Sequence, residues 1–177
     1  MYHVIEEVKD FYKVIPLLSF RKTPGVSFDI IPQSMVPRVD AVDRVIHTGA
    51  APSPGAVGPI ARPWYMHTHQ DDNLMVLAGM RHIELYTHEH GEIYEFELTA
   101  ERITRNGELI CDGPCMLAWP CQVFHRIQSD RQHGSISVNL ATRHDGIDME
   151  NNFSIYDVDI EAGTHHEIRK GTLDQFI

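Results

Sequence analysis

Short segments of strand-like composition follow one another along the chain after Arg62, each closed by turn residues. They are Trp64–His69, Leu74–Leu77, His82–Thr87, Ile93–Leu98, Glu108–Cys111, Met116–Trp119, Val123–Gln128 and Ser135–Ala141. Turn signals such as Asn106-Gly107 and Gly113-Pro114 separate them. Many short strands at close spacing, with no helix between them, predict an all-β antiparallel barrel or sandwich.

The N-terminal segment has a different pattern. Apolar residues between Val4 and Ile15 recur at helical spacing with charged residues between them, so we predict a short amphipathic helix that ends near Pro16. Residues 23–58 are irregular and rich in Pro and Gly. We expect one domain, consisting of an N-terminal extension (1–60), a barrel core (61–145) and a polar C-terminal extension (146–177).

Composition narrows the classes of partner. The chain has 177 residues, with 15 Lys and Arg against 25 Asp and Glu, a formal net charge of -10. This balance argues against binding to nucleic acid or to an anionic membrane surface. No apolar run approaches the ~20 residues that cross a bilayer, and the N-terminus lacks the pattern of a signal peptide. We therefore expect a cytoplasmic protein whose three cysteines, Cys111, Cys115 and Cys121, are free thiols.

Histidines supply the candidate chemistry. Among twelve histidines, His67 and His69 are separated by one residue in a predicted strand, where alternate side chains share a face roughly 7 Å apart at Cα. Two imidazoles at this spacing can bind one metal ion. Coincidental pairs are also expected in so histidine-rich a chain, and His88/His90 and His165/His166 lie in settings where both rings are simply solvated. The pair alone leaves both interpretations open.

Two longer stretches resemble the conserved motifs of the cupin superfamily. WYMHTHQDDNLMVLAG (64–79) resembles the first motif, which has H-x-H, an acid and a later Gly, and GPCMLAWPCQVFHRIQS (113–129) resembles the second, with Pro120 and His125 at matching spacing. The resemblance covers about residues 60–141. It implies the cupin double-stranded β-helix, or jelly-roll barrel, to which we add the predicted N-terminal helix. It also implies a metal site on His67, His69, His125 and an acid.

The sequence departs from the motifs at three positions. The usual Glu of the first motif is replaced by Asn73, and counting back from Gly79 places Asp72 at the acid instead. In the second motif Gln122 replaces a turn Gly and Ser129 replaces Asn. We therefore expect one divalent transition metal (Fe, Zn, Ni or Mn) on His67, His69, Asp72 and His125, or on the three histidines alone if Asp72 does not reach.

The resemblance leaves the reaction open, because cupins include dioxygenases, decarboxylases, isomerases and binding proteins. We expect a metal-dependent enzyme of the dioxygenase type acting on a small organic molecule. The alternative is a non-catalytic ligand-binding or metal-sensing protein, and a sugar-nucleotide isomerase is a weaker third option. Residues expected to line the cavity, or else to belong to the barrel core, are Tyr65, Met75, Leu77, Trp119, Gln122 and Phe124. Exposed strand edges also suggest a homodimer.

Overall fold

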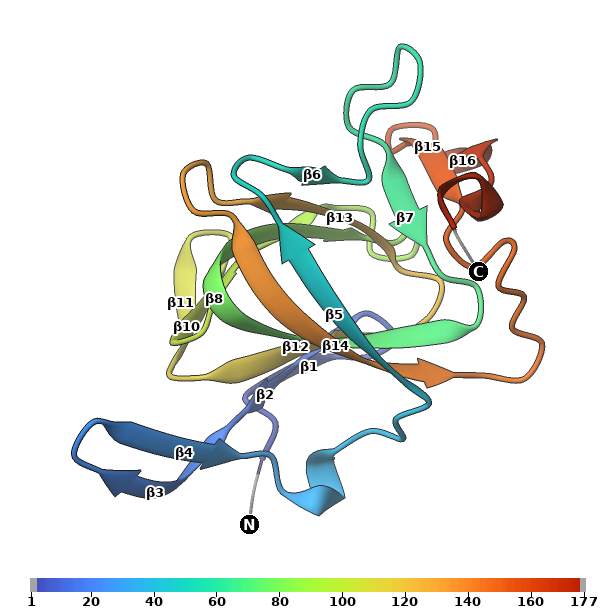
Figure 1. The fold of residues 1–177 in the computed structure, drawn as a ribbon. Coiled ribbons are helices and arrows are strands. Elements are labelled where there is room, and N and C mark those ends of the chain that lie inside the picture. Colours follow the sequence, from blue (N-terminus) through green and yellow to red (C-terminus); the bar gives the residue numbers. More distant parts are fainter. Residues whose placement is uncertain (1–2, 176–177) are drawn as a thin grey trace.

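The protein is a strand-rich barrel with short extensions at both ends, described over residues 3–175 of a computed structural model (Figure 1). Antiparallel pairing joins fourteen strands into one continuous sheet, while β3 and β4 form a separate hairpin that projects from the barrel. The elements are β1 (Glu6–Val8), β2 (Tyr12–Pro16), β3 (Leu18–Thr23), β4 (Val26–Ile30), η1 (Gln33–Met35), β5 (Ala41–His47), β6 (Pro52–Ser53), β7 (Trp64–Met66), β8 (Gln70–Tyr86), β9 (Tyr94–Thr99), β10 (Arg102–Arg105), β11 (Glu108–Asp112), β12 (Cys115–Trp119), β13 (Phe124–Ser129), β14 (Ser135–Arg143), β15 (Ile155–Asp159), β16 (Thr164–Arg169) and η2 (Gly171–Asp174).

Strand β8 organises the barrel because it belongs to both walls. Its first half pairs with β12 and β14, and its second half pairs with β9 and β13. The turn between the halves falls at Gly79, whose φ of +72° suits glycine, and a Cβ there would lie 2.1 Å from the carbonyl oxygen of Gly134. The two predicted strands Leu74–Leu77 and His82–Thr87 are therefore parts of one long, bent strand.

The predicted N-terminal helix is wrong, because residues 6–16 form the hairpin β1–β2. Asp10, at φ +57°, makes the turn. Tyr12 and Val14 are buried with Lys13 exposed between them, and β2 continues the sheet by pairing with β12. Apolar residues spaced three or four apart fit a helix, but they also fit two short strands on either side of a turn. Pairing with β12 decides between the two.

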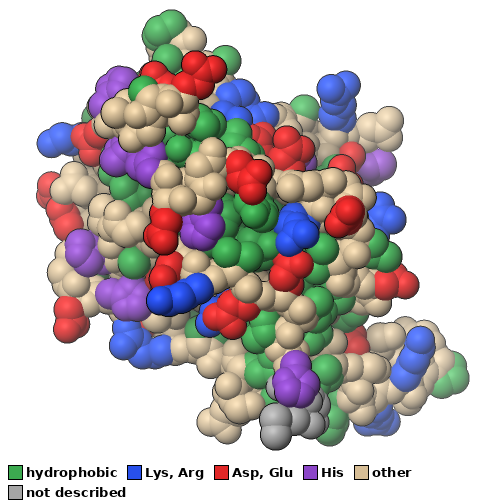
Figure 2. Space-filling model, turned by 180° about the vertical axis from the view of Figure 1, so that it is seen from behind, with side chains coloured by type: hydrophobic (Ala, Val, Ile, Leu, Met, Phe, Trp, Pro, Cys, Tyr) green, Lys and Arg blue, Asp and Glu red, His purple; other side chains and the backbone are tan. Residues whose placement is uncertain are grey.

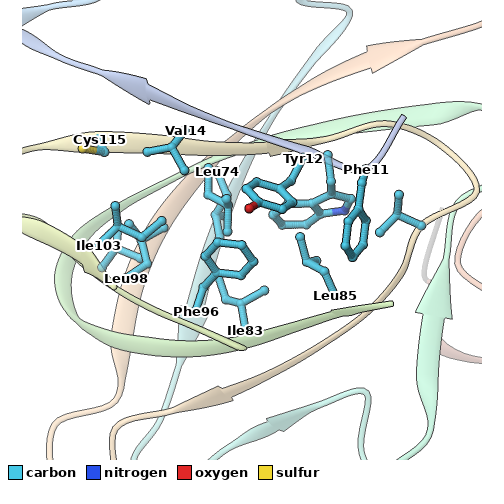
Figure 3. Close-up of a cluster of buried hydrophobic side chains, with 14 residues drawn as sticks. Phe11, Tyr12, Val14, Leu74, Ile83, Leu85, Phe96, Leu98, Ile103 and Cys115 are labelled. Carbon is cyan, nitrogen blue, oxygen red and sulfur yellow. The ribbon is translucent and has the colours of Figure 1, made fainter. Parts of the chain in front are cut away.

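The main hydrophobic core fills the space between the walls (Figure 3). Phe96 is fully buried, and its ring lies edge-on to Tyr12 at 4.9 Å between centroids. Ile83 and Leu85 of β8 point into the same cluster, as do Leu98 and Ile103 from the β9–β10 hairpin. The N-terminal hairpin thus completes the core of the barrel through Phe11, Tyr12 and Val14.

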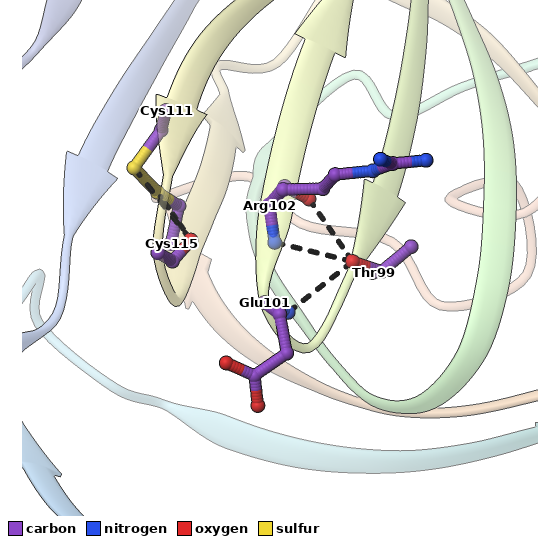
Figure 4. The surroundings of a disulfide bond; sticks show 6 residues. Thr99, Glu101, Arg102, Cys111 and Cys115 are labelled. Carbon is purple, nitrogen blue, oxygen red and sulfur yellow. Dashed lines mark hydrogen bonds between the residues drawn. A yellow bond between two sulfur atoms is a disulfide. The ribbon is translucent and has the colours of Figure 1, made fainter.

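Two of the three cysteines form a disulfide, which corrects the expectation of free thiols. The turn at Gly113-Pro114 brings Cys111 at the end of β11 next to Cys115 at the start of β12 (Figure 4). On the neighbouring hairpin, the Thr99 hydroxyl accepts hydrogen bonds from two backbone N–H groups of the β9–β10 turn. Cys121 has no disulfide partner among residues 3–175.

The surface is of mixed charge. Acidic and basic side chains are interspersed over the face shown in Figure 2, with histidines among them. Within residues 3–175, no helix has the length and apolar character needed to span a bilayer.

Candidate functional site

Three predicted site residues meet inside the barrel. His67 follows β7, Asp72 lies near the start of β8, and His125 lies on β13. Strand pairing places His125 opposite Tyr65 and Asp72 opposite Trp119, which brings the three side chains to one end of the barrel. Nε2 of His67 is 3.2 Å from Oδ2 of Asp72, and Nε2 of His125 is 3.9 Å from the same oxygen. All three residues are buried. We call them the buried cluster.

The outer atoms of the buried cluster are all held by the protein. The Nδ1 atom of His67 bonds to the carbonyl of Asn152, and that of His125 bonds to the carbonyl of Val123 at 3.2 Å. These contacts place a hydrogen on each Nδ1, since a carbonyl oxygen can only accept. The inner Nε2 atoms therefore face Asp72.

The carboxylate is fixed in the same way. Oδ1 of Asp72 accepts hydrogen bonds from the side-chain amides of Gln70 at 3.0 Å and Asn139 at 2.8 Å, which leaves Oδ2 for the two histidines. Gln70 and Asn139 come from β8 and β14, so the orientation of Asp72 is set by two strands of one wall. Hydrogen bonds of this kind from neighbouring side chains fix the orientation of a carboxylate that takes part in catalysis or metal binding.

Burial and neighbouring charges shift the pKa values of His67 and His125 in opposite directions. Burial opposes charge on His67, but the adjacent Asp72 carboxylate outweighs it and raises the pKa of His67. The same pairing holds the pKa of the Asp72 carboxyl well below its usual range despite its burial. Burial, together with the charge on His67, lowers the pKa of His125 to about 4. The Asp72 carboxylate thus favours the protonated form of His67, whereas His125 is a neutral imidazole at neutral pH in the absence of a bound ion.

His69 lies outside the buried cluster, contrary to the predicted ligand set. Strand β7 ends at Met66, and residues 67–69 bend before β8 begins at Gln70, so the two-residue alternation of a strand does not apply. Nδ1 of His69 contacts the Thr68 hydroxyl at 3.0 Å, and its ring packs against Gly146. The metal-ligand group that the structure brings together is His67, Asp72 and His125.

Two of the six predicted cavity residues border the buried cluster. The ring of Trp119 lies 5.3 Å from that of His125, and the ring of Tyr65 lies 6.0 Å from it, centroid to centroid. The indole N–H of Trp119 and the amide oxygen of Asn152 are buried without a hydrogen-bond partner within residues 3–175. The buried cluster therefore has an unpaired donor and an unpaired acceptor on neighbouring residues.

The other four predicted residues face elsewhere, and strand alternation explains three of them. Asp72, Leu74 and Val76 point inward along β8, so Met75 packs in a separate cluster with Met116 and Leu77 is 56% exposed. Phe124 neighbours the inward-facing His125 and packs on the opposite side with Trp64 and Tyr86. Gln122 lies in the β12–β13 turn at φ +68° and donates to the carbonyl of Thr68.

Residues from the C-terminal extension were missed by sequence reasoning. Asn152 fixes His67 through its backbone carbonyl, and the ring of Phe153 lies edge-on to the His67 ring at 5.0 Å between centroids. The Asn152 contact uses the backbone, so the residue type gives no hint of it. The sequence around Phe153 predicts only an ordinary strand. Asn139 was missed as well, because Ile136, Val138 and Leu140 of β14 predict the other face of this strand as the buried one, whereas Asn139 is buried in the structure.

The comparisons with known proteins agree on the fold. No family model matches the sequence, and no curated protein sequence matches it. Among solved structures, the sugar 3,4-ketoisomerase QdtA from Thermoanaerobacterium thermosaccharolyticum, in complex with TDP, superposes with a TM-score of 0.55 at 15% identity, covering 78% of this chain and 84% of its own. The TDP-quinovose 3,4-ketoisomerase WlaRB from Campylobacter jejuni gives 0.54 at 16% identity, covering 80% and 89%.

A third neighbour has a related activity. The dTDP-4-dehydrorhamnose 3,5-epimerase from Sulfolobus tokodaii gives a TM-score of 0.53 at 15% identity, covering 77% of this chain and 72% of its own. The chain therefore has the same RmlC-like jelly-roll fold as these structures, in agreement with the fold that the two motifs predicted. The predicted dioxygenase class is wrong, because the structures that resemble the chain are isomerases and an epimerase of nucleotide-linked sugars.

Proposed function

We propose that the protein is an isomerase or epimerase that moves a proton at the carbon next to the carbonyl of a keto sugar, free or nucleotide-linked. The observation that carries this proposal is the placement of two imidazoles around one buried carboxylate. The structural neighbours support the substrate class, since one is a ketoisomerase mutant in complex with TDP-4-keto-6-deoxyglucose.

The two imidazoles have complementary roles in this proposal. His125, neutral and with Nε2 free of a strong partner, accepts the proton from carbon, while protonated His67 donates to the carbonyl oxygen. The product of this step is an enediol, and no net oxidation occurs. Addition of a proton to the former carbonyl carbon, with loss of the hydroxyl proton from the carbon that was first deprotonated, gives the isomer. Return of a proton to the opposite face of the carbon that was first deprotonated, with loss of the proton from the former carbonyl oxygen, gives the epimer. The Asp72 carboxylate stabilises the positive charge on His67 before the proton is transferred.

Access to the buried cluster requires a local movement. The ring of Phe153 covers His67, and both imidazoles are buried. A sugar ring can therefore reach the two imidazoles only after a local movement, and Phe153, which packs on His67, is the side chain that we expect to move. The unpaired Trp119 N–H offers a donor to an oxygen of the bound sugar.

Deuterium exchange tests the proposal. The protein is incubated in D2O with TDP-4-keto-6-deoxyglucose and, separately, with nucleotide-free keto sugars, and deuterium at carbon is followed by NMR. We expect incorporation that requires His125 and is lost in His125→Ala, while His69→Ala, outside the buried cluster, retains it. Exchange that is equal in wild type and His125→Ala, or absent with every keto sugar, would contradict the proposal.

A resident divalent cation is a second candidate use of the same residues. The donor atoms of His67, Asp72 and His125 lie within 4.8 Å of one another, and all their outer atoms are held by the protein, as is usual around metal ligands. Two imidazoles and a carboxylate suit Fe, Zn, Ni or Mn. When bound, such an ion would polarise a carbonyl oxygen. Elemental analysis of the wild type and of His125→Ala, both purified without added metal, tests this use. Stoichiometric metal that disappears in the variant supports it. Metal-free wild type with full exchange activity rejects it.

We also propose that the protein forms a homodimer. The projecting β3–β4 hairpin exposes Phe20 (67%) and Phe28 (52%), whose rings contact only each other among the aromatic pairs of residues 3–175. Exposed Val42, Ile46 and Ile136 lie on the paired strands β5 and β14. Burial of these side chains against a second copy would stabilise both. Sedimentation should show a dimer that Phe20→Asp weakens; a monomeric wild type at micromolar concentration contradicts this proposal.

A further inference from the structure

A second group of ligand-type side chains lies close to the buried cluster but on a different face. Asp71 is near the start of β8, Cys121 is in the β12–β13 turn, and His144 directly follows β14. One oxygen, the sulfur and one imidazole nitrogen of these residues lie within 4.8 Å of one another. Oδ1 of Asp71 is 2.9 Å from Nε2 of His144 and accepts a hydrogen bond of 2.8 Å from the backbone N–H of Cys121.

This group is open to solvent, unlike the buried cluster. The side chain of Asp71 is 28% exposed and that of His144 is 43% exposed, and Cys121 is half-buried. Asp71 and Asp72 are successive strand residues, so their carboxylates point to opposite faces of β8. The two groups therefore do not share a donor atom, and each can be tested by itself.

The backbone already holds the three side chains in place. The N–H of His144 donates to the carbonyl of His69 at 2.9 Å, and the N–H of Gln122, next to Cys121, donates to the carbonyl of His67 at 2.8 Å. Both ligand-bearing segments are thus tied to the bend at residues 67–69, directly before Asp71. The contact between His144 and Asp71 accounts for two of the three side chains, but it leaves the thiol beside them without a role.

We propose that Asp71, Cys121 and His144 form a site for a divalent transition metal of the Zn2+ type. Thiolate, imidazole and carboxylate are the donors that zinc takes in proteins, and three protein ligands leave an open position for water. Zinc bonds of roughly 2.0–2.3 Å set tetrahedral donor atoms roughly 3.3–3.8 Å apart. Oδ1 of Asp71 and Nε2 of His144, now 2.9 Å apart, therefore have to separate slightly, which a small rotation of the exposed His144 side chain achieves. On binding, the Cys121 thiol loses its proton to solvent, and the cation replaces the proton between His144 and Asp71.

Cobalt titration tests this site because the buried cluster contains no sulfur. Co2+ is added to protein freed of metal by a chelator, with the Cys111–Cys115 disulfide intact and no thiol reductant present. We expect a near-ultraviolet thiolate-to-cobalt absorption that saturates at one equivalent and is displaced by Zn2+. Cys121→Ser should abolish this absorption, and His144→Ala should raise the Kd by about tenfold or more.

Two controls separate this site from other sources of the signal. His125→Ala disrupts the buried cluster and should retain the absorption, and the double variant Cys111→Ser/Cys115→Ser should retain it as well. Absence of the absorption in the wild type at millimolar Co2+, or its persistence in Cys121→Ser, overturns the proposal. The outcome is independent of the proposed isomerase activity, since no sugar is used.

Discussion

His67 lies with one ring nitrogen 3.2 Å from the Asp72 carboxylate and the other against the carbonyl of Asn152, a residue 85 positions further along the chain. One imidazole therefore connects β8 to the C-terminal extension. This connection explains how a segment outside the two sequence motifs sets the tautomer and the orientation of a site residue.

Replacing Asp72 should affect catalysis far more than replacing His69. Asp72→Asn removes the negative charge that raises the pKa of His67 and favours its protonated form, so we expect the rate of deuterium exchange to fall by about 100-fold or more. His69→Ala should remain within about twofold of the wild type, because His69 contacts neither His67 nor His125. Equal losses of exchange rate in both variants would show that His69 belongs to the site, as the sequence predicted, and would contradict a site formed by His67, Asp72 and His125 alone.

The pH dependence of the same rate should show His125 as a base. Its pKa of about 4 means that the neutral form prevails above that pH. We expect the exchange rate to decline as the pH falls through about 4, since protonated His125 cannot accept a proton. A rate that rises on acidification would assign His125 the role of the acid.

His47 should weaken the fold in acid. Burial and the nearby Arg81 cation lower the pKa of His47 to about 4, so the unfolded chain takes up a proton below pH 6.5 that the folded protein does not. The protein therefore has its full stability, as far as His47 is concerned, above pH 6.5. The free energy of unfolding then decreases as the pH falls to about 4, by about 1–2 kcal/mol after allowance for solvent screening. Urea unfolding at pH 7 and pH 5 should show a smaller difference in His47→Gln than in the wild type.

Gly79 should be the more sensitive of two glycines with almost the same φ. Gly79→Ala places a Cβ 2.1 Å from the Gly134 carbonyl oxygen, and Gly91→Ala places one where nothing lies within 4 Å. We expect Gly79→Ala to destabilise the protein by about 3 kcal/mol, and Gly91→Ala by about 1 kcal/mol from backbone strain alone. Thermal unfolding of the two variants measures the difference. Similar melting temperatures would show that the bend in β8 does not need glycine.

Phe96 should contribute more to stability than any exposed apolar residue. Its ring is fully buried against Tyr12, so Phe96→Ala is expected to cost about 3–5 kcal/mol. Leu173, 65% exposed, provides the matched truncation: Leu173→Ala should change stability by less than about 0.5 kcal/mol. Chemical denaturation of both variants provides the test. A loss below about 1 kcal/mol for Phe96→Ala would place the core elsewhere.

Local patterns in the sequence predict the barrel strands well, because each wall alternates between a buried and an exposed face. Ile83 and Leu85 point inward in β8, as alternation requires. The pattern fails where pairing with a distant strand decides the structure. Val8 and Phe11 fit a helix until β2 pairs with β12, and His69 fits the face of His67 until the chain bends after Met66.

The candidate site is predictable in part for the same reason. His67, Asp72 and His125 follow from motif spacing, but two of the contacts that orient them, from Asn139 to Asp72 and from Asn152 to His67, come from residues outside both motifs. Composition assigns Met75 and Leu77 to the cavity, although their positions along β8 place them away from the buried cluster. Their side chains follow the bend and pairing of β8, which composition does not encode.

The continuous run of β8 through both walls has a consequence for how the barrel opens. A barrel built from two independent sheets could separate along the seam between them, whereas here the seam is crossed by covalent backbone at Gly79. Amides on the two halves of β8 should therefore exchange with solvent deuterium at matching rates, as members of a single cooperative unit.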